Sequence, residues 1–251
     1  MNALSISATP WDERPLGLRT AEFKHAPIEP GQKCDWLGIQ NTEVAGRLPD
    51  VIYGRLPADD IEALAAAQHA GFHFVECSMD LALKLNNAWS PPKYASKPLS
   101  IEPAKSADIE AVEELAASMF EYGRFAEDPV FAREKVALRQ RSMVRDLHKQ
   151  GASVHITRAN GQVAGFMISK RDTAVATSQL ILGGVDPNFR MLTYRFWATC
   201  LESQRSTGST LVTTRVSAAN VPVLNLYSAF GFSVTSTLWG VRWLRRGAKS
   251  E

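Results

Sequence analysis

A short segment near the C-terminus places two polar side chains where they could contact one ligand. The segment 220–232 has the sequence NVPVLNLYSAFGF, with Asn220 seven residues before Tyr227 and a Gly-Phe pair beginning four residues after it. This pattern predicts a short helix that ends at a glycine and is followed directly by a strand. Asn220 also suits a helix N-cap, and the apolar spacing of Leu224, Tyr227 and Phe230 also suits ordinary packing on a sheet.

The elements that must position this segment follow in quick succession after a linker at 86–100, which is rich in proline and serine. Their order is β-α-α-β-β-β-α-β-α-β, which predicts a mixed α/β sheet with helices on its faces. Asp128 and Pro129 are expected to begin the second helix, and Asn160-Gly161 to turn a hairpin. The predicted ranges are 99–105, 106–120, 128–151, 153–171 (the hairpin), 177–185, 190–208, 209–216, 221–231 and 232–244.

The region before the linker shares one plan with the C-terminus. Residues 68–85 and 227–244 both give the end of a helix, a Gly-Phe pair and a long alternating strand. The similarity indicates either a truncated copy of the same half-fold or two unrelated helix-to-strand turns. We therefore expect a smaller N-terminal α/β partial domain at 1–90 and a larger domain at 98–251.

Composition excludes several classes of function. The chain has 251 residues, is 45% hydrophobic and carries a formal net charge of +2, so nothing favours binding to nucleic acid or a membrane surface. Three distant cysteines make neither a disulfide framework nor a metal cluster. A cytoplasmic protein without a signal peptide, membrane span or metal is expected.

The element order, together with the motif N-x-x-x-x-x-L-Y-x-x-x-G-F, resembles the GNAT family of acyl-CoA-dependent N-acyltransferases over residues 98–246. The segment YGRFAEDPVF at 122–131 is similar to bacterial nucleotide-sugar N-acyltransferases such as dTDP-fucosamine acetyltransferase. These enzymes also carry a partial N-terminal domain. Residues 34–48 keep Asp35, Trp36 and Gly38 of its WDS-F-G segment, in a different order.

The resemblance implies roles for individual residues. Tyr227 matches the general acid that protonates the departing thiolate, and Asn220 matches a CoA-contacting asparagine. Strand 177–185 would form one side of a slot between splayed strands, where pantetheine pairs with the backbone through Gly183, Gly184 and Val185. Acetyl-CoA or another short acyl-CoA is the expected co-substrate.

The family's pyrophosphate loop is altered in this chain. The aligned stretch RMLTYR keeps Arg190, but Thr193 and Arg195 replace small residues that leave room for the phosphates. Either the loop of Arg190, Leu192, Thr193, Tyr194 and Arg195 runs differently and its arginines carry more of the charge, or CoA binding has been lost. A solvated helix start is the structural alternative for both arginines.

On the acceptor side, the resemblance assigns Arg124, Phe125 and Asp128, while no general base is evident. Phe125 could equally pack in a core, and Asp128 could cap a helix. The expected activity is transfer of an acyl group to the amine of a dTDP-linked amino-deoxysugar, with a role in lipopolysaccharide O-antigen biosynthesis and a homodimer as the assembly. The alternatives are a GNAT enzyme acting on another small amine or a peptide N-terminus, and a degenerate, non-catalytic acyl-CoA-binding domain.

Overall fold

The computed structural model describes residues 4–25 and 34–248, so parts of the two predicted domains, 1–3, 26–33 and 249–251, lie outside the described residues. All ten described strands belong to one sheet, whose order is β1-β2-β3-β10-β4-β9-β8-β7-β6-β5. The strands are β1 Leu4–Ala8, β2 Thr20–His25, β3 Val51–Pro57, β4 His73–Lys84, β5 Glu102–Pro103, β6 Ser153–Ala159, β7 Gln162–Asp172, β8 Thr177–Val185, β9 Leu211–Ser217 and β10 Ser233–Leu244. The helices are α1 Pro10–Leu16, α2 Trp36–Gln40, α3 Ile61–His69, α4 Ile109–Met119, α5 Arg133–Lys149, α6 Thr193–Ser206 and α7 Val221–Ala229, with 3₁₀ turns η1 Lys93–Ala95, η2 Ser106–Asp108 and η3 Pro187–Leu192.

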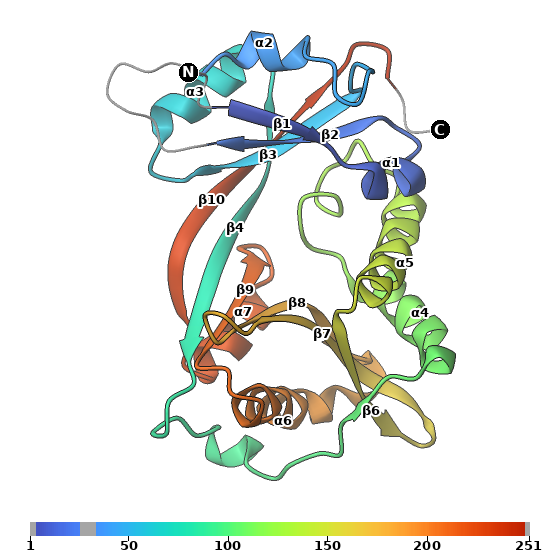
Figure 1. Ribbon diagram of the computed structural model, residues 1–251, viewed down its shortest axis with the longest axis vertical. Helices are drawn as coiled ribbons and strands as arrows, with labels where there is room; N and C mark the ends of the chain where they lie inside the picture. The colour runs from blue at the N-terminus through green and yellow to red at the C-terminus, as the bar shows by residue number, and fades with distance from the viewer. Residues whose placement is uncertain (1–3, 26–33, 249–251) are drawn as a thin grey trace.

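The N-terminal and C-terminal parts exchange strands. β4, from the N-terminal part, pairs with β9 and β10, while β10, the last strand, pairs with β3 and β4. Figure 1 shows these two long strands running side by side between the two parts of the molecule. Each part therefore completes its half of the sheet with a strand of the other, and the predicted boundary near residue 90 falls in the loop after β4.

The internal repeat suggested by the two Gly-Phe turns is present and longer than expected. The unit β3-α3-β4 recurs as β9-α7-β10 with element starts 160 positions apart: Val51 and Leu211, Ile61 and Val221, His73 and Ser233. The caps recur too, because the Asp60 and Asn220 side chains accept from Ala63 N and Val223 N. Gly71 and Gly231 then end the helices at φ values of 85° and 88°, which favour glycine.

Helices α4 and α5 cover one face of the C-terminal strands, and α6 and α7 pack on the other side of the sheet (Figure 1). α5 also reaches α1 of the N-terminal part, where Arg139 Nε lies 2.6 Å from Asp12 Oδ1 and Arg14 Nη2 lies 2.9 Å from Asp146 Oδ2. The two parts are thus joined by ion pairs as well as by the shared sheet.

The predicted mixed sheet with flanking helices is confirmed, and so is the order of elements after the linker. Asn160 and Gly161 turn the predicted hairpin with φ values of 52° and 80°. Two boundaries were wrong. The predicted strand 99–105 is reduced to Glu102–Pro103, and α5 begins at Arg133 rather than at Asp128. Asp128 does not cap it, because its carboxylate pairs with Arg242 and accepts from Val130 N.

Candidate active site

Strands β8 and β9 begin as a parallel pair and then separate. They pair only from Thr177–Leu211 to Gln179–Thr213, and beyond this point the Thr214 hydroxyl donates to the Leu180 carbonyl at 3.1 Å. On its other edge β8 is bulged, since Ile168 faces Leu182 and Ser169 faces Leu180, which leaves Ile181 as an extra residue. The sheet is therefore open between the C-terminal ends of β8 and β9.

A cavity of about 490 Å³ passes through this opening. Consecutive residues of both strands line it, namely Gln179, Leu180, Ile181, Leu182 and Gly183 of β8 and Thr214, Arg215, Val216 and Ser217 of β9. Residues of α5, which packs on one face of the sheet, and of α6 and α7, which pack on the other, also line it, so the cavity reaches both faces of the sheet. Two reactants could thus meet within it from opposite sides.

Tyr227 lines the cavity on the α7 side of the sheet, together with Trp197, Asn220 and Val223. Its side chain is held by α7 and by the Phe232 ring, whose centroid lies 4.8 Å away, and the residue is only 5% exposed. Burial raises the pKa of Tyr227, and polar contacts with Trp197 and Thr214 oppose part of that rise. The phenol therefore stays protonated at neutral pH, as a proton donor must.

Asn220 is the predicted cap of α7 and also lies at the cavity, while its contact with CoA stays a prediction. Its side chain caps α7 by accepting from Val223 N at 3.4 Å, and the residue also lines the cavity. Gly183 lines the cavity as well, whereas Gly184 and Val185 lie beyond it. A Cβ on Gly184 would meet Met119, and Val185 is buried in the core around α6 and α7.

The predicted pyrophosphate loop lies outside the cavity lining. η3 runs directly into α6, so the Thr193 amide donates to Arg190 O, and Thr193 Oγ1 donates to the same carbonyl. Arg195 donates to the carbonyls of Lys97 at 2.8 Å and Pro98 at 3.2 Å, which fixes the linker on α6. Leu192 packs on the core and the Tyr194 ring contacts Tyr94 at 5.1 Å, while Arg190 stays exposed.

The fit to an acyl-CoA therefore differs between its two ends. The opening between β8 and β9, with Gly183 and Asn220 on its edge, offers room and backbone groups for a narrow pantetheine arm. At the start of α6, the first helical amide is already bonded, so the bare amides that usually hold a pyrophosphate are fewer. Arg190 is the exposed cation of this stretch.

On the opposite side, the cavity is lined by ionic side chains from both parts of the chain. Arg55 Nη2 lies 2.5 Å from Glu76 Oε1, and Arg124 Nη1 lies 2.7 Å from Glu22 Oε1. The predicted residue Arg124 also lies over the Tyr53 ring, 4.1 Å from its centroid. This side of the cavity is therefore a polar chamber, whose wall includes Glu22, Arg55, Glu76 and Arg124.

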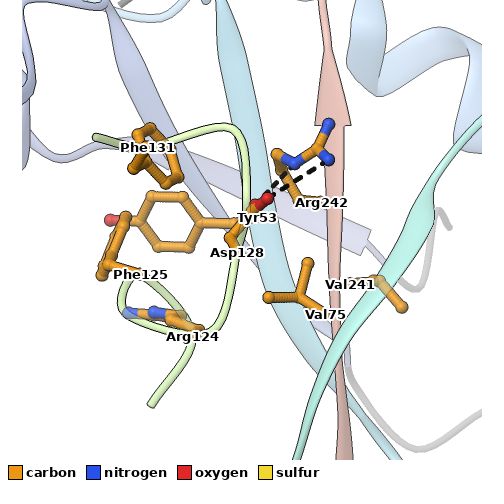
Figure 2. A pocket seen from close by; sticks show the side chains of 8 residues that line it. All are labelled: Tyr53, Val75, Arg124, Phe125, Asp128, Phe131, Val241 and Arg242. Carbon is orange, nitrogen blue, oxygen red and sulfur yellow. Dashed lines mark hydrogen bonds and ion pairs between the residues drawn. The ribbon is translucent and has the colours of Figure 1, made fainter. Parts of the chain in front are cut away.

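The three residues predicted for the acceptor side do not all reach this chamber. Arg124 and Phe125 line it, and the buried Phe125 ring packs on Tyr53 and Phe131. Asp128 lies behind them, where it forms a buried ion pair with Arg242 at 2.6 Å (Figure 2).

Sequence reasoning missed Arg55, Glu76 and Arg215. One signal was available, since Arg55 and Arg215 stand 160 positions apart and so occupy the same place in the repeated unit. Gly240 of β10 pairs with Arg55 of β3 on one side and with Glu76 of β4 on the other. Because it has no side chain, it leaves the space in which the Arg55 and Glu76 side chains meet. A Cβ on this glycine would lie 2.5 Å from Glu76 Cγ.

Among the described residues of the N-terminal part, aromatic side chains pack beside the strand pair that corresponds to β8 and β9. β2 and β3 also pair in parallel over only three positions, but Phe23, Trp36 and Phe72 pack edge to face beside them with centroids 5.2–5.8 Å apart. Ala67 stands where the repeat would place the equivalent of Tyr227. Among the residues 4–25 and 34–248, no helix is long and apolar enough to cross a membrane, and no His, Cys, Asp or Glu cluster is arranged for a metal.

No protein-family model matches the chain, and no curated protein matches it. Several solved structures are similar at low identity. A GCN5-related N-acetyltransferase from Sphaerobacter thermophilus superposes with a TM-score of 0.63 at 16% identity, covering 98% of this chain and 78% of its own. A tandem GNAT protein from the clavulanic acid biosynthesis pathway gives 0.59 at 16% identity, covering 90% of this chain and 75% of its own.

A GNAT-family acetyltransferase from Colwellia psychrerythraea gives a TM-score of 0.53 at 12% identity, covering 89% of this chain and 76% of its own. At sequence identities of 12–16%, the similarity to these structures shows the fold of the chain alone. The tandem neighbour also fits the two-part layout seen in the repeated unit. The chain therefore has the GNAT fold.

Proposed function

We propose that the chain is an N-acyltransferase that moves an acetyl or other short acyl group from acyl-CoA to an amine. The observation that carries this proposal is the cavity through the sheet, which meets a protonated, buried phenol on one face and an ionic chamber on the other. The GNAT fold of the chain supports it. The chemistry gains chiefly from holding an amine and a thioester together in one cavity.

In the proposed reaction, the amine lone pair attacks the thioester carbon and the C–S bond then breaks. The oxyanion that forms between these events needs a fixed donor, and the bulge at Ile181 supplies backbone groups that are outside the strand ladder. Tyr227 gives its proton to the departing thiolate, and the proton lost by the amine passes to water and returns to the tyrosinate. Asn220 and Gly183 would contact the pantetheine arm.

At the nucleotide end, we propose that Arg190 contacts the CoA phosphates. The other predicted loop residues, Leu192, Thr193, Tyr194 and Arg195, would shape this end without donating from the first helical amide. Val185 and Gly184 would support the strand behind the pantetheine. The bonded helix start also favours one alternative, a non-catalytic domain that binds acyl-CoA weakly or not at all.

For the acceptor, we propose a dTDP-linked amino-deoxysugar. The similarity of segment 122–131 to nucleotide-sugar N-acyltransferases supports it, as do Arg124 and Phe125 in the chamber wall. Asp128 would act indirectly, by fixing the loop that carries these residues. Such an acceptor belongs to lipopolysaccharide O-antigen biosynthesis, and a homodimer and a cytoplasmic location complete the proposal. Another small amine or a peptide N-terminus is the competing acceptor class.

Thiol release from acetyl-CoA, measured against a panel of amino-sugar nucleotides, free amino sugars and peptides, tests the proposal. We expect turnover with the nucleotide sugars, and Tyr227→Phe should lower kcat by about 10²–10⁴-fold without changing acetyl-CoA affinity. Leu226→Met, a conservative change at the neighbouring buried position of α7, serves as the control. Turnover by Tyr227→Phe at the wild-type rate would refute the general-acid role, and binding without turnover for any acceptor would favour the non-catalytic alternative.

A further inference from the structure

Three arginines from three distant segments line one side of the cavity. Arg55 comes from β3, Arg124 from the loop between α4 and α5, and Arg215 from β9. Arg55 lies beside Ser78 and Glu76 on β4, and Arg215 makes two bonds to Asp80 at 2.6 and 3.0 Å. In the sheet order β3-β10-β4-β9, two strands separate β3 from β9, but both arginines reach β4, where their partners Glu76, Ser78 and Asp80 occupy alternate positions of one strand.

Each of these guanidinium groups has N–H donors that make no hydrogen bond within the described residues. Within the described ranges, Arg55 donates from Nε and Nη2, Arg215 from Nε and Nη2, and Arg124 from Nη1 alone. A guanidinium has five N–H groups, so Nη1 of Arg55, Nη1 of Arg215, and Nε and Nη2 of Arg124 remain available to a ligand. Planar paired donors of this kind match the oxygens of phosphates and carboxylates.

Arginines outnumber carboxylates in the cavity wall, although each of the four arginines is paired with an Asp or Glu. Four arginines line it, because Arg139 joins the other three, whereas the acidic lining residues are Glu22 and Glu76. Burial, together with the nearby charges of Arg124 and Arg215, lowers the pKa of Arg55 to about 10, and Glu76 opposes part of this shift. The field at Arg55 is thus unfavourable to its own cation, and an anion bound there would relieve it.

We propose that Arg55, Arg124 and Arg215 form an anion subsite that holds a phosphate or carboxylate group of the acyl acceptor. This inference rests on the proposed function, because it takes the bound phosphate or carboxylate to be part of the acyl acceptor. The acceptor then carries an anionic group besides its amine. The inference also gives the truncated N-terminal part a role at the site, because Arg55 belongs to that part.

Calorimetric titration with inorganic pyrophosphate, and separately with malonate, tests the subsite and distinguishes phosphate from carboxylate. Wild-type protein should bind at least one probe, and Arg215→Gln should weaken that binding about tenfold or more, because a charged hydrogen-bond donor is lost. Arg205→Gln is the matched control, since Arg205 is a partly exposed arginine paired with Glu202 on α6, outside the cavity lining. The probe should bind equally well when acetyl-CoA is present at saturation.

A second variant keeps the test valid if Arg215→Gln fails to fold. Arg55→Met combined with Glu76→Met removes both members of the buried pair, so no buried carboxylate is left uncompensated, and it should also weaken the probe. The inference is overturned if wild-type protein binds neither probe, if both variants bind as wild type does, or if acetyl-CoA displaces the probe. Probe binding without acyl transfer would refute only the proposed function, and acyl transfer to neutral amines without probe binding would refute only the subsite.

Discussion

Replacing Asp128 with alanine should destabilise the whole chain rather than only weaken acceptor binding. The Asp128 side chain is 1% exposed and that of Arg242 is 11% exposed, and their atoms Oδ2 and Nε are 2.6 Å apart. The pair joins the loop that carries Arg124 and Phe125 to β10 (Figure 2). In Asp128→Ala the guanidinium of Arg242 stays buried without its partner, and Val130 N loses its acceptor.

The expected loss follows from this burial. Removing one member of a buried ion pair costs about 3–5 kcal/mol. For a chain of this size, a loss of 1 kcal/mol lowers the unfolding midpoint by about 2–4 °C, so we expect a fall of roughly 6–20 °C. Asp128→Leu combined with Arg242→Met should recover most of the loss, because both charges are then removed from the interior.

Thermal and urea unfolding followed by circular dichroism measures both effects. Asp146→Asn is the matched control, since its partner Arg14 has a side chain that is 63% exposed, and the loss of that pair should cost less than about 1 kcal/mol. A free energy of unfolding for Asp128→Ala equal to that of the control would refute this reasoning. A raised KM for the acceptor with an unchanged free energy of unfolding would instead show that Asp128 contacts the acceptor.

Three further predictions concern the shared sheet and its titration. Gly240→Ala should lower the free energy of unfolding by about 1–3 kcal/mol in urea, since its Cβ would lie 2.5 Å from Glu76 Cγ, and unchanged stability would contradict the packing described for Arg55 and Glu76. A fragment containing only 98–251 should give a poorly dispersed NMR spectrum, because β9 and β10 lose β4 from between them; a well-dispersed spectrum would show that the two parts fold separately. Burial lowers the pKa of His155 in the folded chain below its usual value of 6.5. The neutral imidazole of His155 therefore contributes stability above pH 6.5, and this contribution is lost as the pH falls through the pKa of the folded state. His155→Gln should therefore lose less stability than wild type between pH 7 and pH 5 in urea unfolding, and an equal loss would contradict this; His25, whose pKa burial also lowers, accounts for a remaining part of the slope.

Local patterns were sufficient to predict most of the C-terminal part of the fold. The strand at 177–185 and the helix after Asn220 have strong local signals, namely a continuous apolar run and a cap, and both lie where they were expected. The start of α5 was misjudged because Asp128 and Pro129 look like a cap and a first turn, whereas a distant partner, Arg242, takes the carboxylate. Sequence spacing carries no information about such a tertiary pair.

The exchange of strands between the two parts could not be predicted for the same reason, because it also depends on contacts between distant segments. Alternation in 73–84 predicts a strand but not its neighbours, and β4 pairs with residues of β9 that are 127–139 positions away. Arg55, Glu76 and Arg215 meet only because of that pairing, so no local motif marks them as a group. Tyr227 and Asn220 were accessible from sequence because one short helix carries both.

Calorimetric titration of the full chain with acetyl-CoA tests the central claim most directly. The opening between β8 and β9 should accept one molecule per chain, because Phe23, Trp36 and Phe72 fill the related space in the N-terminal part. Saturable binding of one acetyl-CoA per chain is the predicted result. The absence of any binding heat across a range of temperatures, or a stoichiometry of two per chain, would contradict it.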